Sequence, residues 1–178
     1  MNVSVRVKHT HKVVCAALLI AAGVLLPQVF HLIGGDTAGR IFLPMHIPVL
    51  LAGLLLGPVP GVAVGIVTPL LSFLFTGMPA VAVLPFMLFE LFAYGLVSGL
   101  LGQIEKAPLY VALVAAQVAG RLANAGCLFI AGTLLHLKAA PAASVVTAFF
   151  TGLPGIVVQL VLIPPLVYAV RKVAAHRE

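Results

Sequence analysis

The chain carries very little charge. Only 8% of its 178 residues are charged, against about 25% in an average soluble domain, and Asp and Glu together number four. A water-facing surface over most of the chain is therefore excluded. Hydrophobic residues make up 62% of the sequence, and the mean hydropathy is +1.23. This composition indicates an integral membrane protein in a lipid bilayer.

Tryptophan is absent, and cysteine is scarce. The two cysteines, Cys15 and Cys127, both fall inside apolar runs. A disulfide framework is therefore not expected, and each cysteine has the default role of a small buried apolar side chain. Without tryptophan, only Tyr and Phe are left to stack on a flat ring.

Because acidic residues are so few, the net charge is +6, a value that often indicates a nucleic-acid partner. All basic residues except Arg121, however, lie at the two ends of the chain and in short loops, and no basic face is interleaved with aromatic residues. We therefore expect no nucleic-acid partner and interpret the basic residues as signals of membrane topology.

Apolar segments fill almost the whole chain. A spanning helix takes about 20 apolar residues, so the hydrophobic mass fits about six spans with short connections and leaves no room for a soluble catalytic domain. The expected fold is an all-α, single transmembrane domain over residues 1–178. The predicted spans are residues 13–32, 47–56, 59–75, 84–102, 108–135 and 144–170.

The start of the chain has the charged and apolar regions of a secretory signal, and the small residues from Ala21 to Gly23 resemble its cleavage site. The apolar character, however, continues past Pro27 towards Ile33. We therefore expect this segment to be kept as the first span, which puts both termini on one side of the membrane.

Lys and Arg are unevenly distributed between the two sides that six spans define. Short cytoplasmic loops hold the excess of basic residues in membrane proteins, so the more basic side, with both termini, is predicted to be cytoplasmic. That side holds Arg6, Lys8, Lys12, Lys106, Arg171, Lys172 and Arg177, and the other side holds Arg40 and Lys138.

Prolines and glycines interrupt the apolar stretch of residues 41–80. Residues 41–75 are fewer than the roughly 40 residues that two full spans require, so the second and third helices are expected to be short and interrupted. Interrupted helices leave backbone groups unpaired, which hydrocarbon tolerates only beside protein or a polar cavity. This stretch therefore points to a substrate site or a moving part.

Glu90 and Arg121 are charged residues embedded in apolar spans. A charge at the bilayer centre costs at least about 2.5–3.5 kcal/mol, so each needs a partner or water. Both belong to polar stripes at helical spacing, which could face each other across a cavity. The stripes are Glu90, Tyr94 and Ser98 on the fourth span, and Gln117, Arg121 and Asn124 on the fifth.

Two roles fit these embedded charges. Either at least one of them contacts a substrate, or they form an ion pair that only locks the fold. At a helix rise of about 1.5 Å per residue, Glu90 lies roughly 10 Å below the outer end of its span, and Arg121 lies roughly 20 Å below the outer end of its own. A direct pair therefore requires Arg121 to extend outward.

Three further polar residues are candidates for the site. His46, at the outer entrance of the second span, either orients a ligand or is a hydrogen-bonded structural residue. Thr76 lies in one of the outer loops, which are longer and more polar than the inner ones. Gln159 is expected to join helices rather than contact a ligand. No metal site is predicted, because the six histidines are scattered without paired ligand spacing.

Ala17 and Ala21 stand in a small-xxx-small relation on the first span. Two small residues one turn apart allow another helix to approach closely. That helix belongs either to the same chain or to a partner protein.

The segment of residues 46–65 has a distinctive order of features: an Ile-Pro entry, an Ala-Gly pair, a Leu-Gly-Pro turn and later glycines, in the sequence HIPVLLAGLLLGPVPGVAVG. It resembles the second and third helices of the substrate-binding S-components of energy-coupling-factor (ECF) transporters, which supply vitamins and related micronutrients to prokaryotes. The short chain, six spans and alanine-rich first helix agree with this likeness, which covers nearly the whole chain.

The resemblance implies a six-helix S-component of a prokaryotic plasma membrane, which captures a vitamin or precursor from outside and associates with a transmembrane coupling protein and two ATPases. Ala17 and Ala21 would meet the coupling protein. The chain has no phosphate-binding loop, so ATP is hydrolysed elsewhere, and no cofactor is expected. The implied pocket residues are His46, Thr76, Glu90, Tyr94, Asn124 and Arg121.

Two other functions are compatible with six interrupted spans. One is a self-sufficient small-solute channel or secondary transporter. The other, an intramembrane enzyme with Glu90 or His46 as acid or base, is disfavoured because no Ser-His dyad, HExxH or other catalytic spacing is present. The ligand stays open among thiamine precursors, pyridoxine-like rings, pantothenate, folates and corrinoid fragments.

Overall fold

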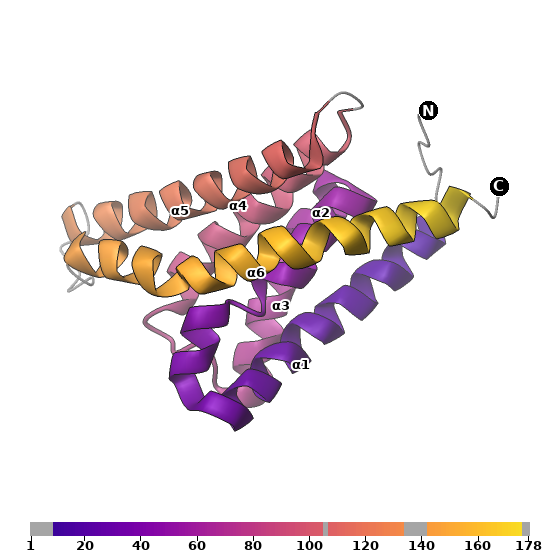
Figure 1. Ribbon diagram of the computed structural model, residues 1–178. Helices are drawn as coiled ribbons and strands as arrows, with labels where there is room; N and C mark the ends of the chain where they lie inside the picture. Colours follow the sequence, from indigo (N-terminus) through magenta and orange to yellow (C-terminus); the bar gives the residue numbers. More distant parts are fainter. Residues whose placement is uncertain (1–8, 105–106, 134–141, 176–178) are drawn as a thin grey trace.

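The computed structural model describes residues 9–104, 107–133 and 142–175. Within these ranges the chain forms helices joined by short connections and no strand, as the sequence predicts (Figure 1). Several basic residues that entered the prediction of topology lie outside the described residues. They are Arg6, Lys8, Lys106, Lys138 and Arg177.

Six helices make up the described chain: α1 (His9–Phe42), α2 (His46–Leu56), α3 (Pro58–Thr76), α4 (Leu84–Gly102), α5 (Leu109–Thr133) and α6 (Ala142–Ala175). Six segments are long and apolar enough to cross a membrane, which confirms the predicted all-α architecture of about six spans. They are Thr10–Gly35, Thr37–Leu56, Pro58–Thr76, Leu84–Gly102, Leu109–Thr133 and Phe150–Ala174.

The second spanning segment consists of two helical pieces. α1 loses helical geometry at Gly34 and Gly35, and Gly35 has φ 63° and ψ −162°, a combination open essentially to glycine alone. The chain turns there, continues as a helix to Phe42, and breaks again over residues 43–45 before α2 (Figure 1). Residues 37–42 are therefore helical, although the predicted spans left them in a connection. The two adjacent glycines allow the chain to turn within a very short segment, so the residues after them can form a helix.

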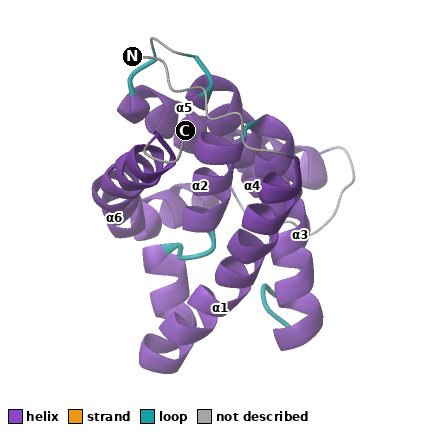
Figure 2. Ribbon diagram, turned by 90° about the vertical axis from the view of Figure 1, so that its right-hand side faces the viewer, coloured by secondary structure: helices purple, strands orange, loops and turns teal. Residues whose placement is uncertain are grey.

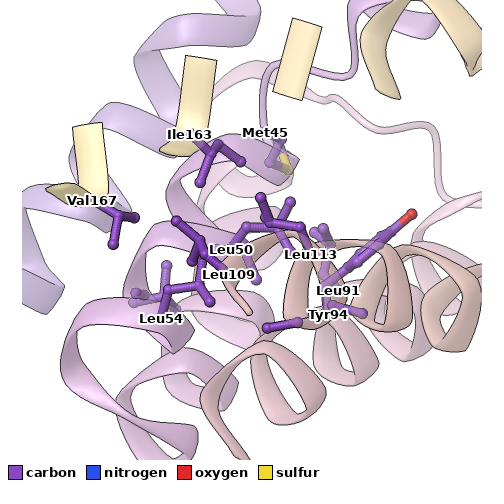
Figure 3. Packing of buried hydrophobic residues seen from close by; sticks show 14 residues of the cluster. Met45, Leu50, Leu54, Leu91, Tyr94, Leu109, Leu113, Ile163 and Val167 are labelled. Atoms are coloured by element: carbon purple, nitrogen blue, oxygen red, sulfur yellow. The ribbon is translucent and has the colours of Figure 1, made fainter. Parts of the chain in front are cut away.

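α2 lies at the centre of the bundle. It packs against α1, α3, α4 and α6, and Figure 2 shows it enclosed by its neighbours. In the most apolar 18 residues of the segment Thr37–Leu56, 61% of the residues are buried, against 11–33% in the corresponding stretches of the other five spans. Val49, Leu50 and Ala52 of α2 are fully buried and join side chains of α4, α5 and α6 in the core cluster of Figure 3.

α3 and α4 touch through their backbones. An added Cβ at Gly61 would lie 2.5 Å from the carbonyl oxygen of Gly95, and one at Gly95 would collide with the carbonyl oxygen of Gly61. Gly65 and Gly99, one turn further along each helix, lie equally close to the facing backbone. Because lipid tails are as apolar as leucine, such close packing, rather than hydrophobic burial, holds helices together in a membrane.

Arg171 joins the ends of α2, α4 and α6. From α6, its Nη2 donates to the carbonyl oxygens of Leu54 at 3.2 Å and Gly102 at 3.4 Å. Both carbonyls belong to the last turn of their helix, where carbonyl groups lack intrahelical partners and carry partial negative charge. A cation at this point therefore stabilises three helix ends together.

The glycine contact predicts the effect of a single methyl group. Gly95→Ala places a Cβ against the backbone of Gly61, which has little freedom to move, and should lower the free energy of unfolding by about 1–3 kcal/mol. Gly126→Ala is the matched control, because, apart from its chain neighbours and the backbone of its own helix, no described atom lies within 4 Å of its added Cβ. Thermal unfolding of the detergent-purified variants measures both, and equal midpoints would contradict the backbone contact.

Candidate functional site

Glu90 is the centre of a buried polar cluster. It lies on the second turn of α4, with 4% of its surface exposed. Tyr94 donates its hydroxyl to Oε1 of Glu90 at 3.2 Å, and Asn124 donates Nδ2 to Oε2 at 2.8 Å. Arg121 forms an ion pair with the same carboxylate, with Nη1 3.0 Å from Oε1. Side chains from α4 and α5 thus hold one carboxylate between them.

His46 adds α2 to this cluster. Its Nε2 lies 3.5 Å from Oε1 of Glu90, at the limit of hydrogen-bonding distance, and its side chain is 3% exposed. The imidazole meets the Tyr94 ring edge-on, with 5.0 Å between the ring centroids. Since His46 is the first residue of α2, the break at residues 43–45 decides where its side chain lies.

Local helix geometry explains how the cluster assembles. Glu90 and Tyr94 are four residues apart, and Arg121 and Asn124 are three apart, so each pair lies on one face of its helix. Gly120 brings α5 close to α4, because an added Cβ there would lie 2.8 Å from the Tyr94 ring. The missing side chain of Gly120 therefore lets the tyrosine pack against α5.

Glu90 and Arg121 are in direct contact. The depths predicted from the sequence required Arg121 to extend outward to make this contact. α5 has 25 residues and α4 has 19, so depths counted from the ends of the two helices do not correspond. As a result the polar stripes of α4 and α5 meet side chain to side chain, where the sequence suggested a cavity between them.

Thr76 lies outside the cluster. It is exposed at the end of α3, where its hydroxyl donates to the carbonyl oxygen of Ser72 at 2.7 Å and accepts from the N–H of Met78 at 3.3 Å. The structure therefore brings five of the six predicted pocket residues together and leaves Thr76 at the end of its helix. A contact between Thr76 and substrate stays a prediction.

A second set of polar contacts supports the break before α2. Leu43 has a φ of 49°, a backbone conformation that costs a non-glycine residue about 1–3 kcal/mol. Its carbonyl oxygen accepts from the N–H of His46 at 3.1 Å and from Nε2 of Gln159 at 3.4 Å. Gln159 also accepts from Nε2 of Gln117 at 3.0 Å. It thereby joins α5 and α6 to the broken segment, which is the helix-joining role expected from the sequence.

Gly152 and Leu43 belong to the site although the sequence did not indicate them. An added Cβ at Gly152 of α6 would lie 2.8 Å from Nη2 of Arg121 and 3.0 Å from Cδ1 of Leu43. The chain contains 17 glycines, so no single one stands out by sequence. Pro44, directly after Leu43, was the only local signal of an unusual backbone.

Some donors of the cluster remain unpaired. Nε and Nη2 of Arg121 and both ring nitrogens of His46 are buried and have no hydrogen-bond partner among the described residues. A buried donor without a partner costs about 1–3 kcal/mol, and more when it is charged. These groups are therefore available to a bound molecule that supplies acceptors.

The outer face of α5 carries a separate groove of about 590 Å³, lined by residues such as Tyr110, Val114 and Leu122. Its surface is almost wholly apolar, and these three side chains are exposed. Binding sites for small solutes need a few placed polar groups to fix the orientation of the ligand. This groove therefore suits contact with lipid, and the polar cluster is the better candidate site.

Six spans around a buried polar cluster, next to a broken helix, define a membrane protein that handles a small solute. Comparison with known families is more specific: the family described as "ECF transporter, substrate-specific component" matches residues 11–167. The chain belongs to this family, which confirms the resemblance noted in its sequence. No curated protein and no solved structure matches it.

Membership makes this chain the substrate-specific component of an ECF transporter, a multi-pass membrane protein. Such components are subunits of transporters and not enzymes. They act on a small-molecule substrate together with ECF coupling and ATPase components.

The buried ion pair predicts losses of stability that are not additive. Glu90→Gln leaves Arg121 without its counter-charge, and Arg121→Gln does the reverse, so each should lower the free energy of unfolding by about 3 kcal/mol. The double variant leaves no lone charge and should lose clearly less than the sum. Denaturant unfolding of the wild type, the two single variants and the double variant in detergent measures this coupling, with the exposed Arg40→Gln as control. Strictly additive losses would refute the coupling.

Proposed function

We propose that this chain captures a vitamin or related micronutrient from outside the cell and delivers it inward with a coupling protein and two ATPases. The observation that carries the proposal is the convergence of four polar side chains around the buried Glu90, from α2, α4 and α5. Polar groups are expensive inside a membrane, and where they gather they mark a solute site.

The substrate contacts are assigned to His46, Glu90, Tyr94, Arg121 and Asn124. The break at residues 43–45 supports this assignment, because unwound backbone within a span lies beside polar sites in many transporters. Residues 36–46 and 76–83, the latter with Thr76, are the segments that would close over a bound substrate. Both flank the helix ends nearest the cluster.

Ala17 and Ala21 are assigned to contact with the coupling protein. Both are exposed, on a face of α1 that also presents Val14, Leu18 and Leu25. The opposite face of α1 packs on α3 through Gly23, whose added Cβ would collide with Thr68. The small-residue face is therefore left for another helix.

Both termini are assigned to the cytoplasm. The start of α1 and the end of α6 lie at the same side of the bundle (Figure 1). Lys12, Arg171 and Lys172 belong to these two helix ends, and positive charge gathers on the cytoplasmic side. A fusion of green fluorescent protein to the C-terminus should therefore be fluorescent, and a fusion of alkaline phosphatase should be inactive. An active phosphatase fusion would reverse the orientation.

Substrate capture predicts that the purified protein carries a small molecule. Mass spectrometry of the compounds released on denaturation should identify one micronutrient, and the emptied protein should rebind it tightly. Arg121→Ala and Glu90→Ala should each weaken binding by roughly 10- to 150-fold, the equivalent of one lost charged hydrogen bond. Tyr110→Phe, on the exposed face of α5, is the control. Unchanged affinity in both folded variants would remove the cluster from the binding site.

The docking assignment predicts a separation of transport from binding. Ala17→Trp with Ala21→Trp should block uptake in cells that also produce the coupling protein and ATPases, because the bulky rings keep the helices apart, and should leave binding unchanged. Ala63→Trp, at an exposed alanine of α3, is the matched control. Normal uptake by the double variant would contradict docking at this face. Transport by the purified chain alone in liposomes would instead indicate a self-sufficient transporter.

A further inference from the structure

Glu90 has little capacity left to bind a ligand. An ionised carboxylate offers about four acceptor positions on its two oxygens. Tyr94 and Arg121 occupy positions on Oε1, with His46 also at 3.5 Å, and Asn124 occupies one on Oε2. Because Tyr94, Arg121 and Asn124 already donate to this carboxylate and His46 lies beside Oε1, a cationic or donor-rich ligand would find at most one position, on Oε2, still open.

Arg121, in contrast, has a whole edge unpaired. The ion pair with Glu90 uses Nη1, whereas Nε and Nη2 are buried without a hydrogen-bond partner among the described residues. In a guanidinium group the N–H bonds of Nε and Nη2 point the same way, side by side. This parallel pair matches the two oxygens of a carboxylate, which it binds in a bidentate manner.

The surroundings of this edge favour an anion. Nη2 faces α6 at Gly152, which has no side chain to contact the guanidinium, and Leu43 lies on the same side as an apolar wall. His46 is 2% exposed, and neither of its ring nitrogens has a hydrogen-bond partner among the described residues, so its imidazole is a second buried group in the cluster with an N–H to donate. Glu90, the acidic side chain of the cluster, is already neutralised by Arg121.

We propose that the substrate carries a carboxylate and that this group binds the Nε and Nη2 edge of Arg121, between α5 and α6 at Gly152. Glu90 then holds the guanidinium in place, and Tyr94 and Asn124 orient Glu90. The proposal rests on the proposed function, since it assumes that the cluster receives a captured solute. It disfavours cationic substrates, because the free edge of Arg121 consists of N–H donors and has no acceptor to offer them.

Matched pairs of compounds test this inference on the purified full-length chain. Each pair joins a carboxylic acid with a neutral counterpart of nearly the same shape, and equilibrium binding is measured for the wild type, Arg121→Gln and Gly152→Ala. Compounds released from the purified protein are identified by mass spectrometry in parallel, which covers substrates outside the panel. The probes are biotin with biotinamide, pantothenate with pantothenol, nicotinate with nicotinamide and lipoate with lipoamide, beside thiamine, riboflavin and pyridoxine.

The wild type should bind one acid about 10- to 150-fold more tightly than its neutral counterpart, as expected for a charged bidentate contact. Arg121→Gln should reduce this ratio to near one, a change that a merely structural role of the arginine would not produce. Gly152→Ala places a Cβ 2.8 Å from Nη2 and should weaken binding of the acid more than that of the counterpart. If Arg121→Gln fails to fold, Gly152→Ala alone tests whether the acid binds at this edge. Gly126→Ala is the control: space around its added Cβ is open, and the variant should keep the wild-type ratio of affinities.

Three results would overturn the inference while substrate capture stands: a bound compound without a carboxylate, equal affinity for an acid and its neutral counterpart, or an unchanged ratio in both folded variants. If the protein releases no small molecule and binds no probe, the proposed function fails as well.

Discussion

The buried ion pair between Glu90 and Arg121 is the constraint on which the other features of the site depend. Neither charge is tolerable alone in hydrocarbon, where each costs at least about 2.5–3.5 kcal/mol, so α4 and α5 must place them within contact distance, with Nη1 3.0 Å from Oε1. Tyr94 and Asn124 complete the coordination of the carboxylate. With its charge thus balanced, a polar cluster persists at the centre of an apolar bundle.

The remainder of the fold positions this pair by close packing. Backbone contact between Gly61 and Gly95 sets how α4 lies on α3, and Gly120 admits the Tyr94 ring against α5. In a membrane, where hydrophobic burial adds little between helices, such contacts decide rotation and tilt. The break before α2 is fixed similarly, because Gln159 satisfies the carbonyl oxygen of Leu43 that the interruption exposes.

Much of the architecture could be predicted because the bilayer itself imposes it. A hydrocarbon core of fixed thickness requires spans of about 20 apolar residues, so length and hydropathy were enough to find six of them. Residues 37–42 escaped the prediction, since hydropathy does not separate a loop from a short helix that follows a glycine turn. The paired glycines of α3 and α4 are visible in the sequence, but which helices they would bring together is not.

The sequence by itself determined that this is a membrane protein and which polar residues share a helix face, because those properties follow from composition and from the period of the helix. The tertiary structure alone decided that Tyr94, Arg121 and Asn124 all converge on Glu90, that one edge of Arg121 beside Gly152 has no hydrogen-bond partner among the described residues, and that Thr76 lies apart. The physical reason is that helix periodicity fixes the direction of a side chain only relative to its own axis. Which groups meet depends on the depth and rotation that packing against neighbouring helices imposes.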